Sequence, residues 1–438
     1  MDLSRFRPWY AQAGTPRLTV TDSYASGEYH LTVTQQTPPT PGQKDKQPVM
    51  IPLAMALLDG QGNPMPLEKG APETVLVLTE ASHTFTFSVP ERPVPSLLRG
   101  FSAPVQLDYA YDELQLGHLL AHDSDGFCRW DAAQRLWFGA IERLVAGESQ
   151  AEAEAQRLSA ALGLVLDRAA EDPAATAQLL TLPSETTIAD RYAVIPVEEI
   201  HHARSALRSA LGDMFAERWW QMVEQFNTAG DYRPLADDMG SRSLRHQALG
   251  YLAAAHVGGV AERLREIFEK SDNMTDQLGA LRLLVWHKLD GAEDCLASFA
   301  EQWRDEALVL DQWFAVQAAM PGEQSIERVT ELLGDARFDW RLPNRVRALV
   351  GTFVGANPTG FNAASGAGYA LFTNALGELD RINPQVAARL AGAAARLPRL
   401  PAARASMLRG SLDELRRAGC SANLEEVLAR ILSPTDVD

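Results

Sequence analysis

The sequence is poor in cysteine, and it lacks the apolar runs that targeting and membrane segments need. Its three cysteines, Cys128, Cys295 and Cys420, lie far apart and form no Cys-x-x-Cys pair, which favours a reducing compartment without a disulfide framework. The first residues, MDLSRFRPWYAQAG, contain no apolar core of the kind a signal peptide needs. No stretch approaches the ~18 uninterrupted apolar residues of a membrane span. We therefore expect a cytoplasmic protein that has no membrane partner.

Positive charge is also scarce. Forty Lys and Arg residues stand against 57 Asp and Glu residues, so the net charge is −17 at pH 7. Nucleic-acid binding depends on neutralising phosphates with Lys and Arg, so a nucleic-acid partner is not expected. An acidic surface attracts cationic peptides, including free amino termini, but it equally serves to keep a protein in solution. The charge alone leaves both interpretations open.

The zinc-binding helix of many metallopeptidases is missing. None of the nine histidines is followed by Glu, so no His-Glu-x-x-His motif exists. His118 and His122 come closest, because they lie one helical turn apart, but Leu119 stands where catalysis needs a carboxylate base. We interpret both histidines as ordinary helix residues and expect no metal site and no catalytic residue in this chain. No other combination of nucleophile and base stands out.

Before residue 110 the sequence alternates in the manner of β-strands. A turn is predicted at Ser26-Gly27, and Glu73-Thr-Val-Leu-Val-Leu-Thr79 is a candidate for a buried strand. The alternating apolar residues are Leu18 and Val20; Tyr29, Leu31 and Val33; Phe85, Phe87 and Val89; and Val105, Leu107 and Tyr109. Several short strands separated by turns predict a small antiparallel β-sandwich, Ig-like, over residues 1–109.

After residue 110 the sequence is rich in Ala, Leu, Arg and Glu, and its apolar residues recur every three or four positions. Met274, Leu278, Leu281 and Val285 form one such helical stripe. Ser411-Leu-Asp-Glu414 has the pattern of a capping box at a helix start. Helical segments follow one another with short breaks and no strict repeat length. They predict a large all-α superhelical domain, a solenoid of stacked helix pairs, over residues 110–438.

Six separated segments, in the same order, are similar to one known family. They are Phe6–Pro16, Gln36–Pro48, Pro93–Val105, Phe127–Gln134, Asp272–Asp276 and, most extensively, Leu342–Phe361 with the sequence LPNRVRALVGTFVGANPTGF. Together they span almost the whole chain and resemble the C-terminal half of bacterial aminopeptidase N, a zinc-dependent alanyl aminopeptidase of the gluzincin class. The resemblance implies a β-sandwich followed by a helical domain. It also implies that the zinc ligands and the Gly-x-Met-Glu-Asn motif lie in a half that is absent here.

The resemblance further implies where substrate would meet this half. In the family, the helical domain caps the active site and shapes an enclosed substrate chamber, and three positions that line the chamber match Arg347, Gln385 and Arg389. A guanidinium suits a peptide carboxylate or carbonyl, and Gln385 and Arg389 would share a helix face. Asn383-Pro384 is typical of that helix's start. The alternative is that these residues make surface or inter-helix ion pairs.

Two functions follow, from different classes. The first is the non-catalytic C-terminal region of a zinc aminopeptidase, whose partners are the N-terminal and catalytic domains of the same enzyme and which meets peptides only within it. Its zinc would belong to the full-length enzyme, and this chain would carry no cofactor. The second is a free-standing α-solenoid scaffold that binds peptides or proteins without enzyme activity. A former domain interface would leave exposed apolar residues near the sandwich and the first helices, whereas an autonomous scaffold would have polar ends.

Overall fold

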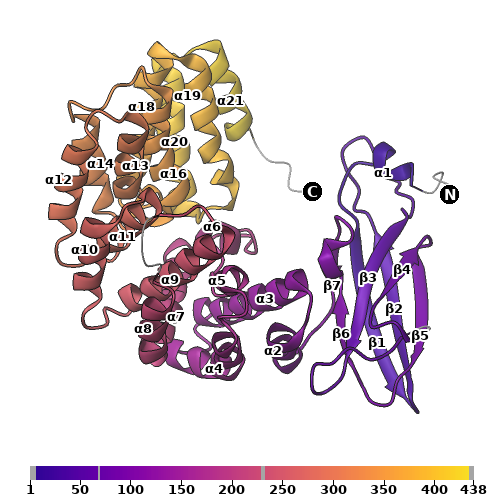
Figure 1. Cartoon of the computed structure of the whole chain (residues 1–438). Coiled ribbons are helices and arrows are strands. Elements are labelled where there is room, and N and C mark those ends of the chain that lie inside the picture. The colour runs from indigo at the N-terminus through magenta and orange to yellow at the C-terminus, as the bar shows by residue number, and fades with distance from the viewer. Residues whose placement is uncertain (1–5, 68–69, 228–231, 434–438) are drawn as a thin grey trace. The chain divides into compact units, whose positions relative to one another are not determined.

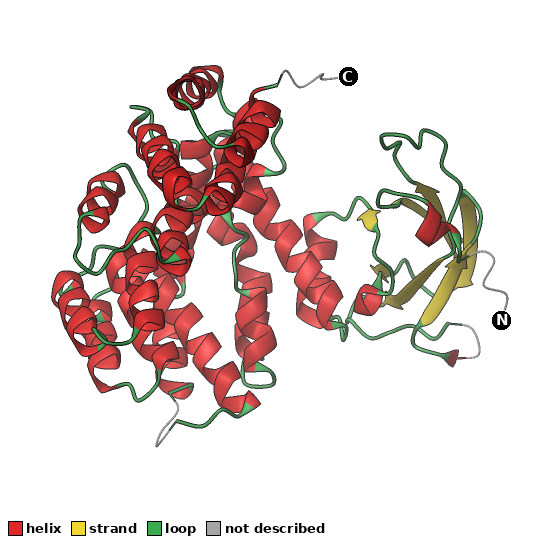
Figure 2. Ribbon diagram, turned by 90° about the horizontal axis from the view of Figure 1, so that it is seen from above, coloured by secondary structure: helices red, strands yellow, loops and turns green. Residues whose placement is uncertain are grey.

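The computed structural model describes residues 6–67, 70–227 and 232–433. The chain forms two compact units, one comprising Met1–Gly139 and Gln156–Thr181, the other Ala140–Ala155 and Leu182–Asp438. Strands occur before residue 110 and helices predominate after it (Figures 1 and 2). Within these described ranges, no helix is long and apolar enough to cross a membrane.

Two sheets make up the N-terminal part of the first unit. The four-stranded sheet has the order β5-β2-β1-β7, and the three-stranded sheet has the order β4-β3-β6. The strands are β1 (Arg17–Ala25), β2 (Glu28–Gln36), β3 (Ile51–Leu58), β4 (Thr74–Leu78), β5 (Ser82–Ser88), β6 (Val94–Leu97) and β7 (Gln106–Asp108). Neighbouring strands are antiparallel except β1 and β7, which run parallel.

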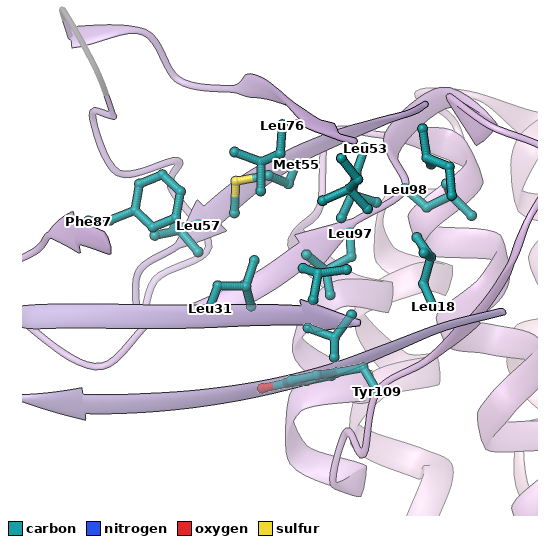
Figure 3. Packing of buried hydrophobic residues seen from close by; sticks show 14 of the residues in the cluster. Leu18, Leu31, Leu53, Met55, Leu57, Leu76, Phe87, Leu97, Leu98 and Tyr109 are labelled. Atoms are coloured by element: carbon teal, nitrogen blue, oxygen red, sulfur yellow. The ribbon is translucent and has the colours of Figure 1, made fainter. Parts of the chain in front are cut away.

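The alternation in the sequence places one apolar face of each sheet in a shared core. In β1 and β2, Val20 pairs with Val33, and the predicted turn at Ser26-Gly27 has φ of 54° and 85°. Glycine adopts that left-handed conformation without strain, which is why it ends a tight hairpin turn. Figure 3 shows Leu18 and Leu31 of one sheet facing Leu53 of the other, and all three side chains are fully buried. The expected Ig-like sandwich is confirmed.

Within the first unit, the sandwich is tied to the helices that follow it. The helices are α2 (Glu113–His122), α3 (Gly126–Val145), α4 (Ala151–Asp167) and α5 (Pro173–Leu179), with α1 (Pro8–Ala11) and η2 (Arg99–Phe101) in the sandwich part. The end of α3 and the start of α4, within residues 140–155, belong to the second unit. Arg99 donates to the buried Asp123 carboxylate at 2.7 Å and to the Ser124 hydroxyl at 2.8 Å. Arg135 of α3 donates to the carbonyl of Leu107 at 3.0 Å. These bonds join η2 to the segment between α2 and α3, and β7 to α3.

The second unit is built of stacked helix pairs. Helices α7, α9, α11 and α13 pack on one another in succession, and α8, α10 and α12 each pack against the helix that follows. The bounds are α6 (Glu185–Ala189), α7 (Val197–Met214), α8 (Ala216–Gln225), α9 (Ala236–Ala254), α10 (Val260–Lys270), α11 (Met274–Trp286), α12 (Ala292–Gln302), α13 (Ala307–Ala318) and α14 (Ser325–Leu333).

The remaining helices complete the C-terminal end. They are α15 (Pro343–Val346), the π-helix η3 (Arg347–Gly351), α16 (Thr352–Ala356), α17 (Pro358–Phe361), α18 (Ala367–Ile382), α19 (Pro384–Ala391), the 3-10 helix η4 (Gly392–Arg399), α20 (Ala402–Ala418) and α21 (Ala422–Leu432). The expected superhelical all-α region is therefore confirmed.

One local prediction is wrong. Ser411-Leu-Asp-Glu414 lies inside α20 and does not begin a helix. The Ser411 hydroxyl donates to the carbonyl of Met407 one turn earlier, so a residue expected to cap the helix instead bonds back along it. The sequence pattern of a capping box identifies a helix start only where the chain is not already helical.

Candidate functional site

Arg347 lies at an irregular turn in the helix that carries the long family-like segment. Helix α15 continues into the π-helix η3, which begins at Arg347, and then into α16. Single π-turns inside helices are frequent at functional sites, because they shift the direction of the side chains around them. A Cβ at Gly351 would lie 3.3 Å from Cγ of Arg347, so glycine there leaves room for the arginine side chain.

Arg345, two residues earlier, holds this helix in place. It is 4% exposed, and its Nε donates to the Asp311 carboxylate of α13 at 2.5 Å. Its guanidinium carbon also lies 4.9 Å from the centre of the Phe314 ring. Because residues two apart point to opposite sides of a helix, anchoring Arg345 leaves Arg347 exposed. No hydrogen bond or ion pair joins the Arg347 side chain to another residue in the described part of the chain.

Gln385 and Arg389 share the exposed face of α19. The predicted start of this helix is confirmed, since the Asn383 side chain accepts a hydrogen bond from the Val386 N–H at 3.2 Å and Pro384 follows at the first position. The opposite face buries Ala387 completely. Gln385 and Arg389 are both exposed, four residues apart, so their side chains emerge on the same side.

The structure brings together only two of the three predicted residues. Gln385 and Arg389 are neighbours on one helix, whereas Arg347 belongs to a different helix. Across the residues that the structure describes, no hydrogen bond or ion pair links Arg347 to the other two. Among the described residues, the three side chains thus have no polar partner and do not form a single cluster. Their role in lining a chamber stays a prediction.

An apolar cavity of about 310 Å³ lies beside the helix that follows Arg347. Val354 and Gly355 of α16 line it, and so does Arg396, whose guanidinium donates to Asp190 at 2.8 Å. The other main apolar lining residues are Ile195, Val197, Ile200, Phe361, Leu397, Leu400 and Leu408. Sequence reasoning missed this cavity, because its walls come from segments about 200 residues apart.

The histidine pair of α2 does not form a metal site. The two ring centres are 5.0 Å apart, and Nε2 of His118 is buried without a hydrogen-bond partner among the residues that the structure describes. Burial, together with the charges of His118 and Arg168, lowers the pKa of His122 and so favours its neutral ring. Neutral imidazoles suit a metal, but the described residues contain no group of three or more His, Cys, Asp or Glu side chains that could hold one. Leu119 is buried at the position of the missing base. His118 and His122 therefore lack the third ligand and the carboxylate base that a catalytic zinc helix needs.

Comparisons with known proteins agree with this architecture. Residues 14–110 match the family model described as a domain of unknown function (DUF3458) with an Ig-like fold. Residues 113–433 match the model described as a domain of unknown function (DUF3458_C) with ARM repeats. The two matches together cover nearly all of the described chain, and the second alone covers most of it.

Relatives of known sequence and structure are aminopeptidases. The chain is 37% identical to aminopeptidase N of Escherichia coli over 99% of its own length and 51% of that protein. It is 35% identical to aminopeptidase N of Haemophilus influenzae over 95% of this chain and 48% of that protein. The crystal structure of Legionella pneumophila aminopeptidase A in complex with aspartic acid matches with a TM-score of 0.84 and 27% identity, covering 98% of this chain and 50% of that one. The chain spans about half the length of these relatives.

Proposed function

Because the chain belongs to the family with DUF3458 Ig-like and DUF3458_C ARM-repeat domains, and is homologous to the C-terminal half of aminopeptidase N, we propose that it is the non-catalytic region of a zinc-dependent aminopeptidase. The single observation that carries this proposal is the coverage: 99% of this chain aligns with only 51% of the Escherichia coli enzyme. The peptide-cleaving machinery would then lie in the other half.

In this proposal the helical domain caps the active site and lines the substrate chamber. Arg347, Gln385 and Arg389 support it, because each offers an exposed polar side chain that no described residue engages. Their guanidinium and amide groups are suited to the carbonyls and carboxylate of a peptide. The boundary between the sandwich and this domain would lie between residues 109 and 110, and the family matches at 14–110 and 113–433 support that position.

The partners would be the N-terminal and catalytic domains of the same enzyme, in the cytoplasm, with zinc held in the catalytic domain. An aromatic cluster in the first unit supports a domain partner. Phe101 is 51% exposed and Trp130 is 40% exposed, and Phe127 lies between them with ring centres at 5.2 Å and 6.1 Å. Such exposed apolar residues are typical of a covered interface. They lie near the sandwich and the first helices, where a former interface is expected.

The test is reconstitution by co-expression. The 438-residue chain is produced with and without a polypeptide that corresponds to the N-terminal half of the Escherichia coli relative. We expect neither half alone to release p-nitroaniline from alanine p-nitroanilide, and the co-purified pair to do so in a way that a chelator abolishes and zinc restores. Hydrolysis by the 438-residue chain alone, or co-purification without activity, would contradict the proposal.

The predicted chamber residues are tested in the same active pair. Arg347→Gln is expected to lower kcat/KM for tetra-alanine about tenfold, because a charge-assisted hydrogen bond is worth roughly that factor. Hydrolysis of alanine p-nitroanilide, which is too short to reach far into a chamber, should change much less. Arg417→Gln is the matched control, since Arg417 is exposed on α20 and the substitution removes the same charge. Equal losses for both substrates would argue against a chamber role.

A further inference from the structure

A second cavity in the helical region has a different character. It has a volume of about 290 Å³ and lies among α9, α10 and the start of α11, within the second unit. Its lining is mostly charged or polar. The basic lining residues are Arg233, Arg242, Arg245, Arg263 and Lys270, and the acidic ones are Asp238, Glu266, Asp272 and Asp276. The described lining thus contains one more cation than anion.

Two of the acidic lining residues are paired with basic lining residues. Asp238 accepts a hydrogen bond from Arg233 at 2.8 Å. Glu266 accepts from Arg263 at 2.8 Å and from Lys270 at 3.0 Å. The hydrogen bonds from Lys270 and Arg263 lower the pKa of Glu266, so this carboxylate is ionised at neutral pH.

The other two acids are engaged as well. Asp276 is 4% exposed and lies 2.6 Å from Arg245. Burial opposes its ionisation, but hydrogen bonds from His246, Arg245 and Asn273 outweigh burial and hold the pKa of Asp276 well below its usual range. Asp272 accepts from the Tyr232 backbone N–H at 2.6 Å. Every acidic lining residue therefore already has a donor.

Arg242 is the cation that no described carboxylate neutralises. It is only 3% exposed, and its polar contact is a 3.3 Å hydrogen bond to the carbonyl of Arg233. Its guanidinium carbon also lies 4.8 Å from the centre of the Tyr232 ring. One carbonyl and one ring leave most of the five guanidinium donors without a partner. A buried guanidinium without a counter-charge is costly, so its presence beside a cavity calls for an anion.

Two other arginines that line the cavity each have an N–H group without a hydrogen-bond partner among the described residues. Nε of Arg245 and Nε of Arg263 are both buried and lack a hydrogen-bond partner among the residues described. Both side chains line the cavity. The other nitrogens of Arg245 bind Asn227 and Asp276, and those of Arg263 bind Glu266 and Glu224, so both guanidinium groups are held in place beside the cavity.

We propose that this cavity binds a small oxyanion, held chiefly by Arg242, with Arg245, Arg263 and Lys270 around it. The ligand class is a free phosphate or a small carboxylate, whose oxygens match the planar donors of guanidinium groups. The proposal goes beyond the peptidase function, because it requires neither the absent half of the enzyme nor the predicted chamber residues. It assigns a ligand site to the helical region itself.

The experiment is isothermal titration of the 438-residue chain with inorganic phosphate and, separately, with succinate, at constant ionic strength set with chloride. We expect one of the two anions, or both, to bind with a stoichiometry of one. Binding of phosphate alone identifies a phosphate-type site, and binding of succinate alone identifies a carboxylate site. Absence of binding by both anions overturns the proposal.

Variants locate the site. Arg242→Gln should weaken binding about tenfold or more, because it removes charge-assisted hydrogen bonds. Arg430→Gln, at an exposed arginine of α21, removes the same charge and should bind like the unmodified chain. Where Arg242→Gln does not fold, Lys270→Gln serves instead, since Lys270 is 72% exposed and its loss should weaken binding severalfold without unfolding the chain. Unchanged affinity in both cavity variants, or equal weakening by Arg430→Gln, would overturn the assignment.

Discussion

The β-sandwich and the helical region bury different kinds of residue. Among the described residues from 14 to 110, the buried polar side chains, Gln35, Thr37 and Ser96, are all uncharged. The helical region buries whole ion pairs, such as Arg345 with Asp311 and Arg245 with Asp276. Two sheets bury a single apolar core between them, whereas a row of helix pairs must also fix each pair against the next. Buried charge pairs between α15 and α13, and between α9 and α11, do so here.

The comparison predicts that breaking a buried ion pair causes the largest loss of stability. Asp311→Ala leaves Arg345 buried without its carboxylate and should lower the free energy of unfolding by about 3–5 kcal/mol. The measurement is urea unfolding followed by circular dichroism. The double variant Asp311→Leu with Arg345→Met is the control, because it removes both charges and should recover much of the loss. A loss below about 1 kcal/mol for Asp311→Ala would show that the pair does not anchor this helix.

In the sandwich, the substitution expected to lower stability most is that of a buried apolar side chain. Leu53 is fully buried in β3, and Leu53→Ala should lower the free energy of unfolding by about 3 kcal/mol through the lost apolar contacts and the cavity left behind. Leu53→Met, which nearly conserves volume, should cost less than about 1.5 kcal/mol in the same urea experiment. Equal costs for the two variants would mean that the core does not depend on close packing at this position.

Low pH should change the stability contribution of the buried ion pair in the helical region but not that of the apolar core in the sandwich. The folded pKa of Asp276 is depressed, so its contribution to stability is complete above the ordinary Asp pKa of about 3.9 and is lost as pH falls through the lower folded value. The stability difference between the unmodified chain and Asp276→Asn should therefore be constant from neutral pH down to about 5 and shrink below about 4. The cost of Leu53→Ala should not vary with pH. A pH-independent cost for Asp276→Asn would contradict the assignment of the buried charge.

The smallest effect is expected at the surface of the helical region. Arg381 and Glu378 are 2.8 Å apart, but their side chains are 75% and 54% exposed. Water and salt screen such a pair, so Glu378→Gln should change the free energy of unfolding by less than about 0.5 kcal/mol. Chemical denaturation at low and high salt provides the measurement. A loss comparable to that of Asp311→Ala would show that exposure does not decide the strength of ion pairs in this protein.

The sequence predicted what depends on local periodicity. Alternation identified Leu18, Tyr29 and Leu31 as sandwich core, and all three are fully buried. The start of α19 at Asn383-Pro384 could be predicted because capping depends on residues within one turn. Strand pairing was harder to predict from the sequence. The parallel pairing of β1 with β7 joins Arg17 to Gln106, which lie at opposite ends of the sandwich sequence.

What the sequence could not predict depends on distant partners. Arg345 and Arg347 look alike in the segment Asn344-Arg-Val-Arg347, yet one is buried and the other exposed. The difference comes from Asp311, which lies 34 residues earlier in the chain. The burial of Arg242 and Asp276 could not be predicted for the same reason, because charged residues at helical spacing are ordinarily surface residues. Both cavities likewise required the three-dimensional arrangement of helices.

The central claim is that this chain works as part of a larger aminopeptidase. Its most direct test is antibody capture from source-cell extract, followed by a denaturing-gel immunoblot and an assay of the captured material with alanine p-nitroanilide. We predict a single band well above 47.9 kDa and release of p-nitroaniline by the captured protein. A band at 47.9 kDa without activity would contradict this account and would make a free-standing peptide-binding scaffold the better description.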